Sequence, residues 1–132
     1  MVKVVTYLLE NNAIVQGLLG VKSHGENHKV FPVIVTQDNK APFSTVRQID
    51  RTRLAQGLSC GTEYTILVSA YTESYDALDE LCEAIVDAVE GQRGTINSVT
   101  VGYCNYDNQT DLEYDKDHGV YGRGTTFKVQ CQ

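Results

Sequence analysis

TEYTILVSAYT, residues 62–72, is the clearest predicted β-strand of the chain. Its residues alternate between two faces, because the side-chain period of a strand is two. One face carries Tyr64, Ile66, Val68 and Ala70, and the other carries Thr65, Leu67, Ser69 and Tyr71. We expect this strand to belong to the main sheet of the domain.

The residues that follow this strand predict an amphipathic α-helix from Asp76 to Glu90. Ser74 is a good N-cap, and the acidic residues after it suit the positive end of the helix dipole. Gly91 suits the position just past the helix end, where a positive φ is common. Apolar residues recur at the spacing of one buried stripe, at Leu78, Leu81, Cys82, Ile85 and Val89. Because Cys82 belongs to this stripe, we expect its thiol to be part of the core.

The same helix carries most of the excess negative charge. The chain has 17 acidic and 11 basic side chains, which gives a net charge of −6. The helix contributes six of the acidic residues and no basic one: Asp76, Asp79, Glu80, Glu83, Asp87 and Glu90. Specific binding of nucleic acid is not expected, because it needs clustered Lys and Arg. The six acids form either a solvated helix face or an acidic surface that attracts a basic protein partner or repels passing DNA.

Upstream of the strand, the sequence predicts helical structure and two more strands. Residues 2–19 carry a helical apolar pattern, which Asn11 and Asn12 interrupt, so a second short helix can begin there. Val30–Thr36 and Phe43–Arg53 contain β-forming residues and predict strands.

Polar connections separate these elements. Residues 22–29 predict a loop, and Pro32 argues for an edge position or a strand start. Residues 51–61 predict an extended arm, whose Gly-containing tip covers residues 54–61.

Downstream of the helix, the sequence predicts two strands joined by a long loop. Thr95–Tyr106 is expected to be one strand, and Asn105–His118 a polar acidic loop. Val120–Cys131 is expected to be the last strand, with Gly122 and Gly124 on one face, where they permit a close approach of a neighbouring chain. The alternating residues of the earlier strand are Val99, Val101 and Tyr103.

The order of the elements predicts an α+β fold in a single domain that covers residues 1–132. We expect two layers: a mainly antiparallel β-sheet of about five strands, and two helices packed on one face of it. A chain of this length forms one core without disulfides or metals.

Motifs that would indicate a metal, a cofactor or catalysis are weak. The four cysteines, Cys60, Cys82, Cys104 and Cys131, are widely spaced and predict neither a zinc site nor a disulfide framework. His24 and His28 are four residues apart, but Gly25 and Asn27 disfavour the helix on which that spacing binds zinc. The acidic residues after Asp111 do not match a calcium loop. We therefore expect no metal, no cofactor and no enzyme activity.

Membrane insertion and secretion are not expected either. The sequence has no apolar run of about 18 residues, and its N-terminus is a poor signal peptide. We expect the protein to be made in a cytoplasm.

Several short motifs, in their order, resemble the tail terminator (tail-completion) proteins of long-tailed phages. The resemblance covers about residues 3–130 and is carried by Ala41-Pro42-Phe43, by Tyr64–Tyr71 with the junction Thr72–Tyr75 and the helix up to Gly91, and by Asp117–Tyr121 followed by Thr125–Val129. The stretches 51–61 and 105–118 depart from the family pattern by being long.

This resemblance implies a structural virion protein in the phage tail or neck, assembled in the host cytoplasm. Such proteins form a ring, usually a hexamer, that sits on the end of the tail tube, ends tail polymerisation and offers a joining surface to the head–tail connector protein. The implied partners are further copies of the chain, the tail tube protein and the connector, while DNA passes through the ring. On this hypothesis the acidic helix either lines the channel or faces outward.

The arm is the expected contact with a neighbouring subunit or the tube, because two leucines lie in its Gly-containing tip. Its candidate interface residues are Arg51, Arg53, Leu54 and Leu58. The alternative function is a small dimeric α+β regulatory or ligand-binding domain. A further alternative is an enzyme that uses Cys60 or a His-lined site, for which no sequence motif is present.

Overall fold

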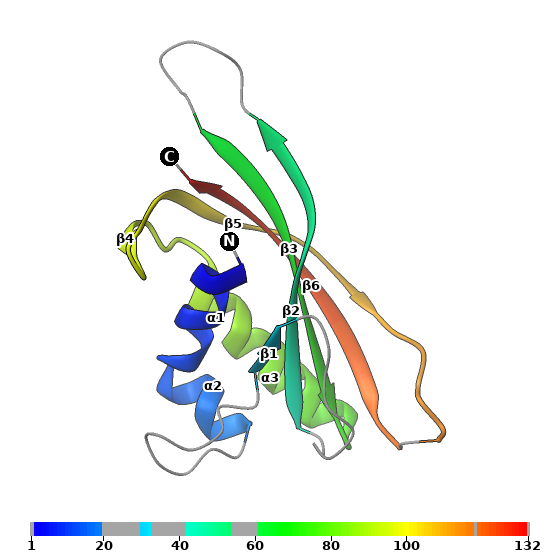
Figure 1. Ribbon diagram of the computed structural model, residues 1–132. Coiled ribbons are helices and arrows are strands. Elements are labelled where there is room, and N and C mark those ends of the chain that lie inside the picture. The colour runs from blue at the N-terminus through cyan, green and yellow to red at the C-terminus, as the bar shows by residue number, and fades with distance from the viewer. Residues whose placement is uncertain (1, 20–29, 33–41, 54–60, 118, 132) are drawn as a thin grey trace.

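The computed structural model describes residues 2–19, 30–32, 42–53, 61–117 and 119–131. These residues form two layers, with the helices on one face of a curved sheet (Figure 1). The helices are α1 (Val2–Glu10), α2 (Ala13–Leu18) and α3 (Tyr75–Val89), and the strands are β1 (Val30–Pro32), β2 (Phe43–Arg53), β3 (Thr62–Thr72), β4 (Gly94–Ile96), β5 (Val99–Asp111) and β6 (Tyr121–Cys131). The predicted α+β fold is confirmed.

The sheet has the strand order β1-β2-β3-β6-β5-β4. All neighbouring strands pair antiparallel except β1 and β2, which pair in parallel. Pro32 therefore lies in an edge strand, as its missing N–H predicts. Residues 33–36 of the first predicted strand and the predicted loop at residues 22–29 lie outside the described part of the chain.

The N-terminal helix is broken where the two asparagines predict it. The Asn12 side-chain oxygen accepts hydrogen bonds of 3.0 Å from the backbone N–H groups of Ile14 and Val15, and so caps α2. Val4, Val5 and Leu9 of α1 are fully buried.

The core lies between the helices and the two central strands, β3 and β6. All five residues of the predicted stripe on α3 are buried, and Ile66 and Phe127 face them from the sheet. Ser74 Oγ accepts a hydrogen bond of 3.1 Å from the Ala77 N–H, which confirms the predicted N-cap. Gly91 has a φ of +81°, as expected just past the end of a helix.

The predicted strand Thr95–Tyr106 is wrong as a single element, because a tight turn divides it into β4 and β5. Asn97 and Ser98 have φ values of 47° and 67°. Two consecutive residues with positive φ form the tight hairpin turn whose twist matches that of antiparallel strands. Asn97 adopts this conformation readily, and Ser98 occupies the position where such a turn commonly has glycine.

The predicted alternation of Val99, Val101 and Tyr103 on one face is also wrong at its end. Val101 pairs with Cys131, whereas Tyr103 pairs with the next residue of β6, Gln130. This bulge reverses the facing of the strand. Cys104 is consequently fully buried, and Tyr103 is only half-buried.

The predicted loop Asn105–His118 is wrong over its first half, where β5 continues to Asp111. Pairing with β6 satisfies the backbone groups along one edge of this polar stretch, so it forms a strand without an apolar face of its own. Only Leu112–Asp117 lies beyond the strand, and Asp115 there forms an isolated bridge with Val120. His118 is outside the described residues.

The two glycines of β6 lie where side chains of β3 cross over them. A Cβ atom added to Gly122 would lie 3.0 Å from the Tyr71 ring, and one added to Gly124 would lie 3.0 Å from Leu67 Cδ1. The expected close approach is thus made by β3, on the face of the sheet that the helices do not cover.

Candidate functional site

The acidic face of α3 is the first candidate surface. All six of its predicted carboxylates are exposed, because the apolar stripe turns the opposite side of the helix towards the sheet. Asp79 forms an ion pair with Arg123. Within the described ranges, the other five have no ion pair, so this face is strongly negative.

An open hollow lies between α2 and α3, with a volume of about 350 Å³. Its lining combines apolar side chains with three of the helix carboxylates: Asn12, Ile14, Leu18, Glu80, Glu83, Ala84 and Asp87. Ile14 is 68% exposed, which is unusual for a residue of its size. The hollow therefore joins exposed apolar surface to negative charge.

The far end of β2 is the second candidate surface. Arg51 and Arg53 are exposed on the same face of the strand, two residues apart. The Arg51 guanidinium lies 5.7 Å from the centre of the Tyr64 ring, which is within the range of a cation–π contact. Leu54 and Leu58 lie outside the described residues, so the structure brings together only the arginines of the predicted interface.

A polar network around Arg123 of β6 was not predicted from the sequence. Arg123 Nη1 lies 2.5 Å from Asp79 Oδ1, and its Nε donates to Asp111 Oδ1 at 2.6 Å. Its Nη2 donates to the Tyr75 hydroxyl at 3.1 Å, and that hydroxyl donates to Asp111 Oδ2 at 2.8 Å. One arginine therefore joins the first turns of α3 to the end of β5.

The network favours the charged form of Asp111. Hydrogen bonds from Arg123 and then from Tyr75 lower the pKa of this carboxyl below its ordinary value. The hydrogen bond to Asp111 raises the pKa of the Tyr75 hydroxyl, so Tyr75 stays protonated as a donor. Arg123 itself is only 11% exposed, whereas Asp79 and Asp111 are about half exposed.

One signal in the sequence indicates this network. Arg123 is separated from Phe127 and Val129 by an even number of positions in β6, so its side chain lies on the same, helix-covered face of the sheet. A charge on such a face requires a partner. The acidic helix supplies one, but which carboxylate it is depends on how α3 crosses the sheet.

The buried thiols are unsuited to nucleophilic chemistry. Cys82, Cys104 and Cys131 are free and buried. Burial raises the pKa of Cys82 and of Cys104 to about 11, so both are protonated at neutral pH. Cys60, the thiol of the enzyme alternative, lies outside the described residues.

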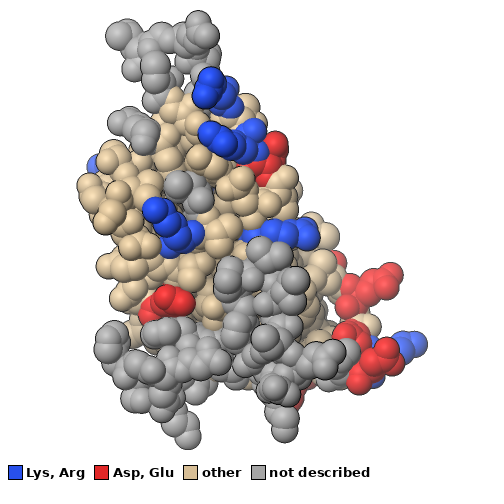
Figure 2. All heavy atoms as spheres, in the orientation of Figure 1, with Lys and Arg blue, Asp and Glu red and all other residues tan. Residues whose placement is uncertain are grey.

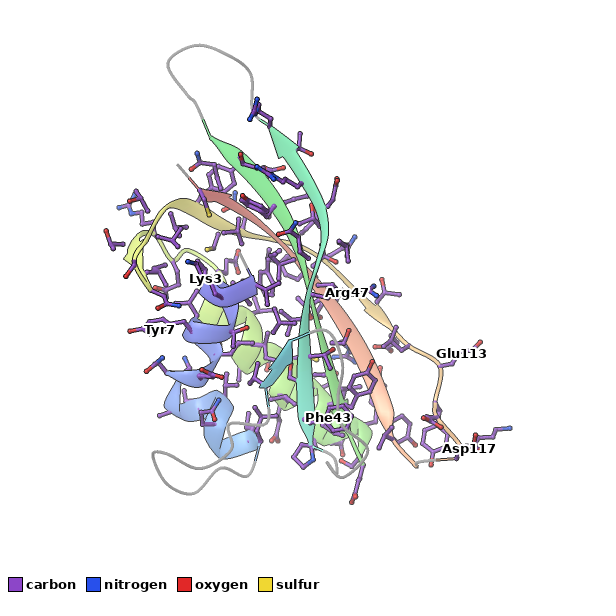
Figure 3. The ribbon with its side chains drawn as sticks, in the orientation of Figure 1. Lys3, Tyr7, Phe43, Arg47, Glu113 and Asp117 are labelled. Carbon is purple, nitrogen blue, oxygen red and sulfur yellow. The ribbon has the colours of Figure 1, made fainter. Side chains whose placement is uncertain are left out.

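A second open hollow, of about 450 Å³, lies against α1. It is lined by Val2, Lys3, Thr6, Tyr7, Glu10 and Asn97, of which Figure 3 labels Lys3 and Tyr7. Across the described ranges, no group of three or more His, Cys, Asp or Glu residues is arranged to hold a metal ion. No described helix is long and apolar enough to cross a membrane.

Comparison with known proteins finds a likeness of structure. No protein-family model matches the chain, and no curated protein matches it significantly. The fold is similar to that of a chain in the virion of a native gene transfer agent particle, with a TM-score of 0.79 and 11% sequence identity. The likeness covers 99% of this chain and 93% of the other. At this identity it shows a shared fold.

Proposed function

We propose that this protein is a structural subunit of a phage-like virion and that it closes the end of the tail tube as a ring. The observation that carries the proposal is the near-complete match, in both directions, to a chain of a gene transfer agent virion.

The surfaces of the described residues are consistent with a role in assembly. The hollows are open, the buried thiols are protonated, and the exposed features are charged faces and single apolar side chains. Surfaces of this kind suit contact with other proteins better than they suit the conversion of a small molecule.

In this proposal the ring, a hexamer, ends tail polymerisation and presents a joining surface to the head–tail connector protein. Its contacts with the tube or the next subunit involve the arm that carries Arg51, Arg53, Leu54 and Leu58. The acidic face of α3 reduces unspecific adhesion of DNA that passes the ring, because like charges repel.

The test combines native mass spectrometry over a concentration series with negative-stain imaging of isolated tail tubes incubated with the protein. A closed ring, and caps on the tube ends, are the expected results. A stable dimer at every concentration that leaves the tubes bare would contradict the proposal and favour a regulatory or ligand-binding domain. The contribution of the arm is tested with the Leu54→Asp/Leu58→Asp variant, which is expected not to cap the tubes.

A further inference from the structure

The sheet has two long edges that no described strand covers. On one side, the described residues of β1 pair with Ser44–Val46, and no described strand pairs with the outer edge of β2 over residues 47–53. On the other side, β4 pairs only with Val99–Val101, and the Gly91 N–H donates to the Cys104 carbonyl at 2.9 Å. No other described strand pairs with the outer edge of β5 over residues 105–111.

These two edges are exposed along their length. Every residue of 47–53 is exposed, and so is every residue of 105–111 except the half-buried Gln109. Each edge also carries one large apolar side chain in water: Ile49 is 47% exposed and Tyr106 is 41% exposed. An open edge of this length is a template for pairing with another strand.

The two edges carry opposite charge. Residues 47–53 hold three arginines and one aspartate, a net charge of +2. Residues 105–111 hold two aspartates and no basic residue; Asp111 is paired with Arg123, so Asp107 is the carboxylate that this edge presents. In Figure 2, most basic side chains of the visible face lie in its upper half, and most acidic ones lie at its lower right. Figure 3 locates Arg47 on β2, and Glu113 and Asp117 just beyond the end of β5.

We infer that the open edge of β2 in one copy of this chain pairs with the open edge of β5 in a second copy. The partner is a copy of the chain because the two edges match each other in length and in charge. They also lie on opposite sides of the sheet, so each copy offers one edge to each neighbour. Such a head-to-tail contact closes into a ring when the rotation between copies permits it. The inference rests on the ring proposed above and assigns its subunit contact.

The direction of pairing follows from the topology. Three antiparallel steps lead from β2 through β3 and β6 to β5, so β2 and β5 run in opposite directions. In a ring with rotational symmetry, every copy has the same orientation to the axis. The strands that meet between copies are therefore antiparallel, which is the more stable arrangement.

Each edge is interrupted by a bulge, between Gln48 and Asp50 in β2 and between Tyr106 and Asn108 in β5. Bulges bend and twist an edge, which hinders pairing with unrelated strands. The contact is thus limited to short ladders beside the bulges, and the opposite charges select the partner edge.

Charge reversal on each edge tests the contact. One variant carries Arg51→Glu and Arg53→Glu, and the other carries Asn105→Arg and Asp107→Arg. Each variant alone is expected to weaken subunit association roughly 10- to 100-fold, because like charges then face each other. The control is Arg93→Glu, an exposed reversal outside both edges, which should leave association unchanged. Circular dichroism checks that all variants are folded.

Mixing the two variants is the decisive step, because the contact is head-to-tail. Reversed β2 then meets reversed β5, and natural β2 meets natural β5. An equimolar mixture is expected to restore rings that contain equal numbers of the two chains, measured by native mass spectrometry. Folded variants that associate like the natural chain, or a mixture that stays dissociated, would overturn the inference. So would a natural chain that remains monomeric at millimolar concentration.

The same experiment separates this inference from the proposed function. Rings that break and recover as described, but do not cap tail tubes, would support the edge contact and contradict the role in the tail. Caps that form equally well with every variant would support that role and place the subunit contact elsewhere.

Discussion

Arg123 and Asp79 lie 44 positions apart in the sequence and form an ion pair of 2.5 Å that joins β6 to α3. Arg123 Nε also donates a hydrogen bond to Asp111. The central sheet, the helix layer and the end of β5 therefore meet at the Arg123 side chain. The acidic helix is therefore anchored by one of its six carboxylates, and the rest of its charged face stays open.

Replacing Arg123 with Met should destabilise the fold by about 1–2 kcal/mol, because hydrogen bonds to three partners are lost while the aliphatic part of the side chain is kept. The loss is limited because both carboxylates are about half exposed and become solvated. Urea unfolding measures the change. Asp76→Asn, on the same helix but outside the network, is the control and should have little effect. An unchanged unfolding midpoint for Arg123→Met would mean that the network is not formed in solution.

Asp111 should make the stability of the protein sensitive to acid. Its pKa in the folded state is below that of the unfolded chain, because Arg123 and then Tyr75 donate hydrogen bonds to the carboxylate. Asp111 therefore makes its full contribution to the free energy of unfolding above the pKa of the unfolded chain, near pH 4. This contribution is lost as the pH falls through the lower pKa of the folded state. Urea unfolding between pH 2 and pH 6 should show a shallower acid dependence for Asp111→Asn than for the natural chain. If stability changed with pH in the same way for both proteins, the pKa of Asp111 would not be lowered in the folded state.

The buried thiols should not react in the folded protein. Burial raises the pKa of Cys82 and Cys104 to about 11, so at pH 8 the thiolate is a minor species that is also inaccessible. In a Cys60→Ser background, a thiol reagent should label the remaining cysteines slowly in buffer and completely in denaturant. Rapid labelling of Cys82 in buffer would contradict its place in the core.

Ser98→Gly should stabilise the protein by about 1 kcal/mol. Ser98 has a φ of 67°, a conformation that costs an L-residue about this much and glycine almost nothing. Thr100→Gly, in the adjacent extended strand, is the matched control and should destabilise the protein. Thermal unfolding distinguishes the two changes, and a loss of stability on Ser98→Gly would indicate that the segment is one continuous strand.

The acidic face of α3 should prevent unspecific binding to DNA. Glu80, Glu83 and Asp87 line one exposed hollow, and among the described residues none of them has a basic partner. A variant that changes all three to Lys should bind double-stranded DNA, with an affinity that falls as the salt concentration rises. The natural chain, and a variant with Gln at the same positions, should bind much more weakly in a filter or fluorescence-anisotropy assay. Equal binding by the Lys and Gln variants would mean that this face does not determine DNA adhesion.

Sequence reasoning succeeded where one periodic pattern ran without interruption. The alternation in residues 62–72 and the stripe from Leu78 to Val89 identified β3 and α3, and the side chains that they bury. It failed where pairing with another strand determined the local structure. Residues 105–111 are polar, but pairing of one edge with β6 makes them a strand. A turn without glycine at Asn97 and Ser98, and a bulge at Gly102, were also missed.

The features of the candidate site were likewise predictable from the sequence only in part. The exposure of the six acids on α3 followed from helical spacing. The arginines at the end of β2 are exposed, and their role at an interface stays a prediction. The Arg123 network and the two open edges were not foreseen, because both arise from segments far apart in the chain.

By itself, the sequence determined the elements with one dominant periodicity, the buried faces of those elements and the concentration of negative charge on a single helix. These properties depend on neighbours within about one helical turn or a few strand residues, and the order of side chains specifies them directly. The tertiary structure decided which strands pair, where bulges shift the register, which carboxylate meets Arg123 and which sheet edges remain open. Those outcomes depend on hydrogen bonds and packing between residues that are distant in sequence, and a local pattern does not encode them.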